Sequence, residues 1–540
     1  MCEPTARIQR LREHALTQMG GEYRVLEPEL LWARSWLASA GQPWTVVRRA
    51  QATAAVLQGI TPAIDPGELL VGKFCRRELA PEETEVLQRY RECSAPAEAP
   101  VWGQRAHMAI DFDRLLRLGV DGLRRDISRY RGRLDPTRPQ DLEQDAFYRA
   151  CLITLEALVA LSHRYAALAE AQAAAESDPA RRAELQRIAA VCRRVPELPA
   201  RSFHEALQAV HFVTFALCAG QRMFLFQLGR PDRYLLPLYR RDLAAGKITP
   251  AQAQELIDCL GLLLSEYTPR GLAVGWMVGG RDASGADVCN ELTAMFLHTV
   301  EHLRLSYPCV GLCWTPETPR EIMELSGRLL AQGLSHPAFF NDDVITAGLL
   351  QAGLPPAEAC LYQHSTCVEI TPIGSSNVYV ASPYFNLLQL LHDELGLPAV
   401  EGTPHPAPSP QPATFEDLLA GYRRRLEQAV RQAVIAENTN QATRRYNGGF
   451  PLLSCFVNDC LARGRDIDHG GARYNWIEPS FLGCLTWSTP WPPSASLSTR
   501  STPSPGMSCS RPWPPTLTGE RTCACGSCTA LPSTATTTRE

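Results

Sequence analysis

Cys367 and Glu369 are the residues of this sequence whose types and spacing best suit chemistry. They lie in the block from His364 to Pro372, which reads HSTCVEITP. On an extended segment, positions i and i+2 point to the same side, so the thiol and the carboxylate would face one cavity. Such a pair suits a reaction in which sulfur handles a hydrogen atom and the carboxylate moves a proton. The alternative is a buried, inert cysteine, because this spacing also arises by chance.

The elements that would position this pair are helices separated by short strands. Apolar residues recur at helical spacing in residues 141–176, 203–217, 250–267 and 415–437. Thr249 and Thr414 precede the last two segments as N-caps. Apolar or β-branched runs predict strands at residues 307–312, 367–370 and 377–381. This alternation predicts an α/β architecture with an α-rich N-terminal part, and the Pro-rich stretch 402–412 predicts a surface loop.

Composition and charge exclude several classes of protein. Apolar residues make up 45% of the 540 residues, which is typical of a globular protein with a large core. The 53 basic and 57 acidic side chains give a net charge of −4, so charge does not favour nucleic acid or an anionic membrane as partners. We find no apolar run long enough to span a bilayer and no signal peptide, and therefore expect a cytoplasmic protein. The 19 cysteines are mostly scattered singly, which predicts reduced thiols that pack as small hydrophobes.

The composition changes after Gly483. Residues 484–540 contain 10 Ser, 12 Thr and 9 Pro, and they contain no Ile, Val, Phe, Tyr, Lys, Asn, Asp, Gln or His. A segment of this composition cannot bury a core, so we expect it to be disordered. Its cysteine cluster at residues 523–528 resembles a metal or disulfide knot, but a segment translated out of frame is the better account.

The frame hypothesis can be tested on the residues themselves, because each residue fixes most of its codon. The last base of Trp487 followed by the first two of Ser488 gives a valine codon, and Trp491 with Pro492 gives alanine. Continued in this frame, residues 486–493 can become DVVDALAA, residues 508–515 can become LLQAALAA, and residues 532–538 can become PKYGNDD. A single shifted frame therefore turns three parts of the tail into ordinary protein sequence.

The block around Cys367 resembles the Cys-Val-Glu loop of the glycyl radical enzymes, the pyruvate formate-lyase-like family. Further segments similar to this family occur in family order and cover most of residues 20–483. They are residues 64–72, 203–206, 228–232, 279–282, 290–292, 337–342 and 470–475. The string PKYGNDD from the shifted frame also resembles the family. We therefore identify the chain as a member.

The resemblance implies a ten-stranded α/β barrel wrapped by helices, incomplete here, at residues 1–483. A cysteine loop would enter the barrel from one side and a glycine loop from the other. It implies that Cys367 becomes a thiyl that abstracts hydrogen from a small substrate and that Glu369 is the general base. The expected partner is an activating enzyme that uses S-adenosylmethionine and an iron–sulfur cluster to generate the glycyl radical. A homodimer is the family-level expectation, with no permanently bound cofactor and no metal.

Two features bear on the reaction and the substrate. Pyruvate formate-lyase has two adjacent cysteines, whereas Thr366 precedes Cys367 here, which favours a lyase, dehydratase or decarboxylase that cleaves C–O, C–N, C–S or C–C bonds. Formate acetyltransferase activity stays as an alternative.

The apolar stretch 223–227, with Phe224, is either a core strand or a pocket wall that favours a substrate with an apolar or aromatic portion. The substrate-binding residues that the resemblance implies are His107, Asp111, Phe224 and Phe339.

The family's glycyl radical segment, Arg-Val-x-Gly followed by an aromatic residue, occurs nowhere in the 540 residues. We therefore expect that a frameshift near Gly483 has removed the glycyl radical domain, that the chain is truncated, and that it is inactive as written. A different class also stays open, a non-catalytic helical binding or scaffold protein descended from the family.

Overall fold

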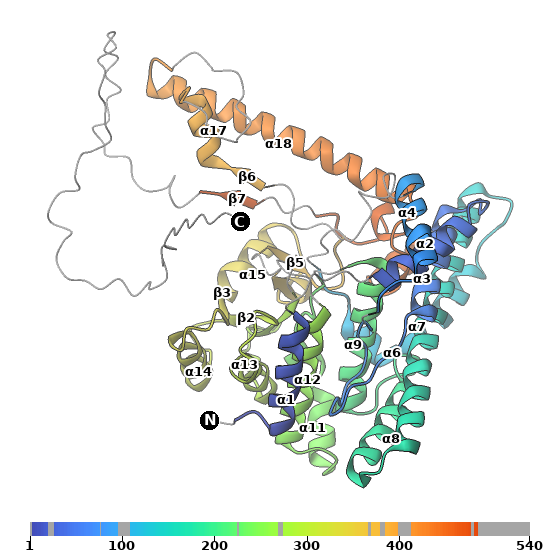
Figure 1. The fold of residues 1–540 in the computed structure, drawn as a ribbon. Helices are drawn as coiled ribbons and strands as arrows, with labels where there is room; N and C mark the ends of the chain where they lie inside the picture. The colour runs from blue at the N-terminus through green and yellow to red at the C-terminus, as the bar shows by residue number, and fades with distance from the viewer. Residues whose placement is uncertain are drawn as a thin grey trace, which may run out of the picture.

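The computed structural model describes most of the chain up to Gly483 (Figure 1). The described residues are 3–19, 26–75, 77–94, 108–223, 226–267, 274–364, 369–377, 384–397, 412–476 and 480–483. The predicted tail at 484–540 and nearly all of the predicted loop at 402–412 lie outside them.

Helices dominate the N-terminal part, as the sequence predicts. They are α1 (Ala6–Met19), α2 (Leu26–Ala38), α3 (Thr45–Gly59), α4 (Pro81–Cys93), α6 (Phe112–Arg131), α7 (Pro139–Ala175), α8 (Pro179–Arg194) and α9 (Phe203–Gln221). The long helix α7 packs against α3 and α8, and α9 is buried along nearly its whole length. Figure 1 shows these helices, apart from α1, gathered on one side of the molecule. A helix that is apolar on all sides is typical of the interior of a large protein.

Helix α7 corrects the expectation that no segment is long and apolar enough to span a bilayer. It has 37 residues, and one 18-residue window of it has a mean hydropathy of 1.3. By length and composition it could cross a membrane, but 56% of that window is buried inside the protein. Its apolar residues therefore serve the core between α3 and α8.

A three-stranded parallel sheet lies at the centre of the α/β part. It contains β1 (Gly275–Gly279), β2 (Cys309–Trp314) and β3 (Ala338–Asn341), in the order β1-β2-β3. Helices α13 (Glu291–Leu303) and α14 (Arg320–Ala331) make the crossovers that parallel strands require. The surrounding helices are α10 (Pro231–Tyr234), α11 (Leu236–Ala244), α12 (Pro250–Tyr267), α15 (Asp342–Gln351) and α16 (Pro356–Ala359).

The two faces of this sheet belong to different hydrophobic clusters. Trp276 and Leu312 pack into the main core with the helices. Met277, Cys313 and Phe340 point to the opposite face, where they form a smaller cluster. This division follows from the alternation of side chains along a strand.

A hairpin packs on the second face of the sheet. Its strands β4 (Tyr362–His364) and β5 (Ile370–Pro372) are antiparallel, and the residues that connect them, 365–368, lie outside the described part. Farther along the chain, β6 (Tyr384–Asn386) pairs in parallel with β7 (Ser480–Leu482). Figure 1 shows α18 lying across the molecule beyond these two strands. The remaining elements are α17 (Leu387–Glu394), α18 (Phe415–Tyr446), α19 (Pro451–Ser454), α20 (Cys460–Arg463) and the 3₁₀ helix η2 (Ile467–His469).

Side chains on one face of α9 form hydrogen bonds with residues 64–72, one of the segments that resemble the family. The side-chain amide of Gln208 accepts from the Val71 N–H (2.9 Å) and donates to the Val71 carbonyl (2.6 Å). One turn later, His211 Nε2 donates to the Gly72 carbonyl (2.6 Å). Gly72 has a φ of +131°, and a Cβ there would lie 3.0 Å from the His211 ring. His204 Nε2 likewise donates to the Leu69 carbonyl (2.9 Å), so the family-like segments 64–72 and 203–206 pack against each other.

The structure confirms the predicted helices and shifts some of their ends. Segments 141–176 and 250–267 correspond to α7 and α12, whereas 203–217 and 415–437 are the first parts of α9 and α18. Helix α18 continues to Tyr446, and its last turn contains Arg444, which pairs with Asp468 in the interior. The strand predicted at 307–312 is found at Cys309–Trp314, since Pro308 has no N–H for a ladder. The strands predicted at 367–370 and 377–381 lie mostly outside the described residues, and β5 begins at Ile370.

Candidate active site

The predicted Cys–Glu loop connects the two strands of the β4–β5 hairpin. Cys367 lies outside the described residues, so the position of its thiol stays a prediction. Glu369 is the first described residue after the loop, and only 8% of it is exposed. Its Oε1 accepts a hydrogen bond from the Oγ of Ser480 (3.2 Å). Ser480 is the first residue of β7. A buried carboxylate thus lies two residues from Cys367 along the chain and contacts a distant strand.

His364 fixes the entrance to the loop. Its ring stacks on Phe340 of β3, with ring centroids 4.7 Å apart. Its backbone N–H donates to Met277 Sδ of β1 (2.9 Å). A Cβ on Gly311 of β2 would come within 2.6 Å of the His364 ring, so the glycine leaves the space that the ring occupies. All three strands of the sheet therefore hold this residue.

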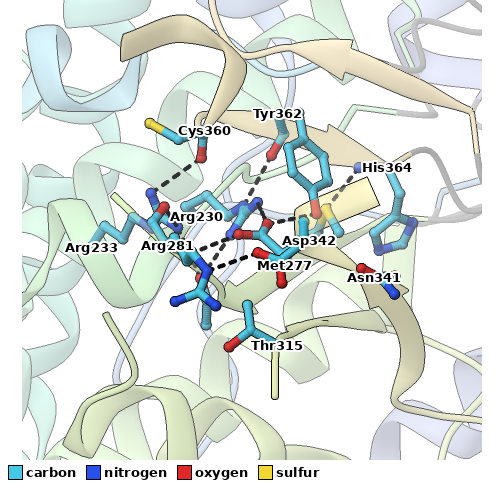
Figure 2. A network of polar contacts seen from close by, with 12 residues as sticks. Arg230, Arg233, Met277, Arg281, Thr315, Asn341, Asp342, Cys360, Tyr362 and His364 are labelled. Atoms are coloured by element: carbon cyan, nitrogen blue, oxygen red, sulfur yellow. Dashed lines mark hydrogen bonds and ion pairs between the residues drawn. The ribbon is translucent and has the colours of Figure 1, made fainter. Parts of the chain in front are cut away.

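Arg230, Asp342 and Tyr362 form a buried polar network behind β4 (Figure 2). Arg230 donates from Nε to the Tyr362 carbonyl (2.9 Å) and from Nη1 to the Gly279 carbonyl (2.8 Å). The Tyr362 hydroxyl donates to Asp342 Oδ1 (2.8 Å), while Asp342 Oδ2 accepts the backbone N–H of Arg281 (2.8 Å). The Arg230 guanidinium also lies 4.6 Å from the centroid of the Tyr362 ring. The network ties β4 to the carboxyl ends of β1 and β3.

Asp232 extends this network to α13. Its Oδ2 accepts from the backbone N–H of Gly279 (2.7 Å) and from the Thr293 hydroxyl (2.8 Å). The Asn290 side chain donates to the Asp232 carbonyl (3.0 Å). Gly280 has a φ of +82°, and a Cβ there would lie 2.8 Å from Asp342 Oδ1. The family-like segments 228–232, 279–282, 290–292 and 337–342 thus converge on one set of hydrogen bonds.

The exit from β5 is held by backbone contacts. The Gly374 N–H donates to the Ala109 carbonyl (2.8 Å), and the Gly374 carbonyl accepts from the Asn458 N–H (2.7 Å). The Asp111 N–H donates to the Phe456 carbonyl (3.3 Å). Gly374 has a φ of +67°, and a Cβ there would approach the Asp111 nitrogen to 2.8 Å. Both ends of the hairpin are therefore fixed to distant parts of the chain.

Burial shapes the titration of the groups around the hairpin. It raises the pKa of the Cys313 thiol to about 11, so this cysteine stays protonated at neutral pH. Burial also raises the pKa of the Tyr362 hydroxyl, which keeps it a donor to Asp342.

Within the described ranges, no group of three or more His, Cys, Asp or Glu side chains is arranged to hold a metal ion.

A family model described as pyruvate formate lyase-like matches residues 77–488, which include the hairpin and its whole network. The chain belongs to this family of glycyl radical enzymes. A solved glycyl radical enzyme from Archaeoglobus fulgidus superposes with a TM-score of 0.80 at 26% identity, over 89% of this chain and 70% of that one. This likeness confirms the expected barrel fold of glycyl radical enzymes.

Curated relatives in this family include dehydratases and lyases. The (2S)-3-sulfopropanediol dehydratase of Klebsiella oxytoca is 27% identical over 70% of this chain and 48% of its own length. The isethionate sulfite-lyase of Oleidesulfovibrio alaskensis is 28% identical over 66% of this chain and 46% of its own. The chain thus spans about half the length of these relatives.

The predicted substrate-binding residues of this family member are placed as follows. His107 and Phe224 lie outside the described residues. Asp111 is the N-cap of α6, where its Oδ1 accepts the Arg114 N–H (2.9 Å). Phe339 is 38% exposed and lies on the face of β3 opposite to Phe340. The structure therefore places Phe340, rather than Phe339, beside the loop entrance, and the substrate contacts of all four residues stay predictions.

The apolar stretch 223–227 is only partly described. Phe226 is buried and its ring packs edge-on against Phe112, with centroids 6.2 Å apart. This residue belongs to the core, in agreement with the core interpretation of the stretch.

Sequence analysis missed the side chains that hold the loop. The residues that contact His364 lie on one face of the parallel sheet and are Met277, Gly311 and Phe340. No single sequence motif links these three positions. Alternation along the three strands gives the face of each residue once the strand ends are known. Their pairing across strands depends on register, which a short apolar run does not specify.

Proposed function

We propose that this chain forms the barrel part of a glycyl radical lyase or dehydratase, with Cys367 as the hydrogen-abstracting residue and Glu369 as the general base. The observation that carries the proposal is the placement of Glu369, buried two residues after Cys367 in a hairpin whose two ends are fixed. Family membership and the dehydratases and lyases among the relatives support the reaction class.

In the proposed reaction Cys367 acts in the first and last steps, and Glu369 acts in the step between them. The Cys367 thiyl takes a hydrogen atom from a C–H bond of the substrate, which leaves a thiol and a carbon-centred radical. Glu369 accepts a proton from the substrate as the neighbouring bond to the leaving group breaks with its electron pair, and the proton then passes to the departing anion, which restores the carboxylate. The product radical then takes the hydrogen atom back from Cys367 and restores the thiyl. Burial of the carboxylate suits this step, because a radical must be kept from water and other hydrogen donors.

The protein glycyl radical is the group that would generate the thiyl, and no Arg-Val-x-Gly segment occurs in the 540 residues. We propose that residues 484–540 are a wrong-frame reading of the gene and that the natural protein has the shifted-frame sequence in their place. Their composition, with 31 of 57 residues Ser, Thr or Pro, supports this proposal. Mass spectrometry of the C-terminal peptides of the natural protein tests it. Peptides with the shifted-frame sequence, such as PKYGNDD, would support the proposal, whereas peptides that match residues 484–540 would contradict it.

Activity of the frame-restored protein tests the proposed function. The protein would be activated anaerobically with a radical S-adenosylmethionine activating enzyme and given isethionate, 3-sulfopropanediol or trans-4-hydroxy-L-proline, with pyruvate and coenzyme A in a separate arm. We expect product from a dehydratase or lyase substrate that depends on activation. Acetyl-coenzyme A formation would favour the formate acetyltransferase alternative. Radical formation without turnover of any substrate in a wider panel would favour a non-catalytic protein.

A further inference from the structure

A cleft of about 540 Å³ opens between the starts of α3 and α7 and the end of α18. Its volume lies in the range of sites for small molecules. None of its lining residues belongs to the parallel sheet or to the β4–β5 hairpin. The cleft is thus separate from the candidate active site.

Two arginines of the cleft lack a counter-ion among the residues that the structure describes. Arg445 and Arg465 both line it. Within the ranges that the structure describes, neither guanidinium makes an ion pair or a hydrogen bond. The adjacent Arg444 shows the contrast, since its Nε lies 2.7 Å from Asp468 Oδ2 in the interior. Unpaired guanidinium groups at a concave surface favour an anion.

The carboxylates of the cleft do not neutralise this charge. Asp466 is buried and accepts from the Phe450 N–H (2.8 Å) and the Ser454 hydroxyl (2.9 Å), so its oxygens are already used. Glu143 is the other acidic residue that lines the cleft. One available carboxylate therefore faces two guanidinium groups.

Arg445 and Arg465 both lie close to the ring of His469, which also lines the cleft. The pKa of His469 lies below the usual value, first because the ring is partly buried and then because Arg445 and Arg465 are close. Glu143 acts on the same ring in the opposite direction. Near neutral pH the imidazole is therefore mostly uncharged, and the positive charge of the cleft comes from the arginines.

Aromatic side chains form the other walls. Tyr446 follows Arg445 at the end of α18 and is 82% exposed, although it is large and partly apolar. Trp44 and Phe147 also line the cleft. Of these three rings Tyr446 is the exposed one, and an exposed aromatic ring can stack on a planar ligand.

We propose that this cleft binds a small anion that carries a planar ring, of the chemical class of a nucleoside monophosphate or an aryl carboxylate. The arginines hold the phosphate or carboxylate, and Tyr446 and Trp44 contact the ring. The proposal is independent of the proposed function, because it concerns binding alone.

Isothermal titration calorimetry on the full 540-residue chain tests the proposal with four probes. AMP and benzoate each carry a ring and an anionic group, whereas inorganic phosphate and adenosine carry one part each. We expect saturable binding of AMP or benzoate, at least about tenfold tighter than either half-ligand. The relative affinity of AMP and benzoate distinguishes the phosphate from the carboxylate. No saturable binding of any probe overturns the proposal, and equal binding of phosphate and AMP overturns the ring contact.

Matched variants test the residues. Arg445→Gln and Arg465→Gln should each weaken binding about tenfold, and Tyr446→Ala should weaken AMP but not phosphate. Arg423→Gln changes an exposed arginine of α18 that does not line the cleft, and its binding should equal that of the unaltered chain. Unchanged thermal unfolding shows that the variants are folded, which we expect because neither arginine has a partner to lose. Binding that survives both arginine substitutions overturns the proposal.

Discussion

The ring of His364 stacks on the ring of Phe340, with centroids 4.7 Å apart, and this contact holds the start of the Cys–Glu loop against the face of the parallel sheet that carries Met277 and Cys313. The relationship joins two segments that resemble the family separately, residues 337–342 and the block that begins at His364. The contact explains why both segments matter to the same site: Phe340 in the first segment holds His364 at the start of the second.

Gly311 should be intolerant of even a methyl group. In Gly311→Ala the new Cβ would lie 2.6 Å from the His364 ring and 3.0 Å from Phe340, so the stack must shift. We expect a loss of about 1–3 kcal/mol in the free energy of unfolding, measured by urea denaturation. Gly327→Ala in α14 is the matched control, because no atom lies within 4 Å of its Cβ, and it should stabilise the helix by up to about 1 kcal/mol. Equal effects of the two substitutions would contradict this packing.

Asp342 should contribute more to stability than its neighbour Asp343. Asp342→Ala removes the acceptor of the Tyr362 hydroxyl and leaves the charge of Arg230 buried, so the free energy of unfolding should fall by about 3 kcal/mol. Asp343 makes an exposed ion pair with Arg281, and Asp343→Ala should cost at most about 1 kcal/mol. The comparison uses denaturant unfolding of both variants. A smaller loss for Asp342→Ala than for Asp343→Ala would show that the network does not stabilise the fold.

His211 should make the protein less stable in acid. Burial lowers its pKa to about 4 in the folded state, from an ordinary value of 6.5. Between these values the unfolded chain binds more protons, so stability falls as the pH decreases from about 6.5 to 4, by about 3 kcal/mol in all.

The His211→Gln variant isolates this contribution, since glutamine keeps an N–H donor for the Gly72 carbonyl. The stability difference between the unaltered chain and the variant should shrink as the pH falls below 6.5. An identical difference at pH 4.5 and at pH 7 would show that His211 does not titrate as described.

The helical part of the fold could be predicted from the sequence because its periodicity is strong and its start signals are local. Thr414 caps α18 by accepting the Asp417 N–H (3.1 Å), as its position before the helix predicts. The continuation of α18 beyond residue 437 was not predicted, and its last turn contains Arg444, whose ion-pair partner Asp468 lies 24 residues away in the chain. Likewise, the apolar window of α7 has no sequence signal that separates a core helix from a membrane helix.

The candidate site was predicted as a local pair but not as a three-dimensional arrangement. The i, i+2 spacing drew attention to Cys367 and Glu369, the resemblance to the family implied their roles, and the structure places Glu369 in the interior. The contact of Glu369 with Ser480 joins residues 111 positions apart, so no local pattern could give it. Phe339 and Phe340 illustrate the same limit, because the face of each is set by strand register.

The account depends on Cys367 as the residue that carries the reaction, and one comparison tests this most directly. The frame-restored Cys367→Ser protein and a Cys93→Ser control, in which an exposed cysteine is changed, would be activated anaerobically and examined by electron paramagnetic resonance and product analysis. We predict the same glycyl radical signal in both proteins, with turnover in the control and none in Cys367→Ser. Product formation by Cys367→Ser at the rate of the control would contradict the central claim.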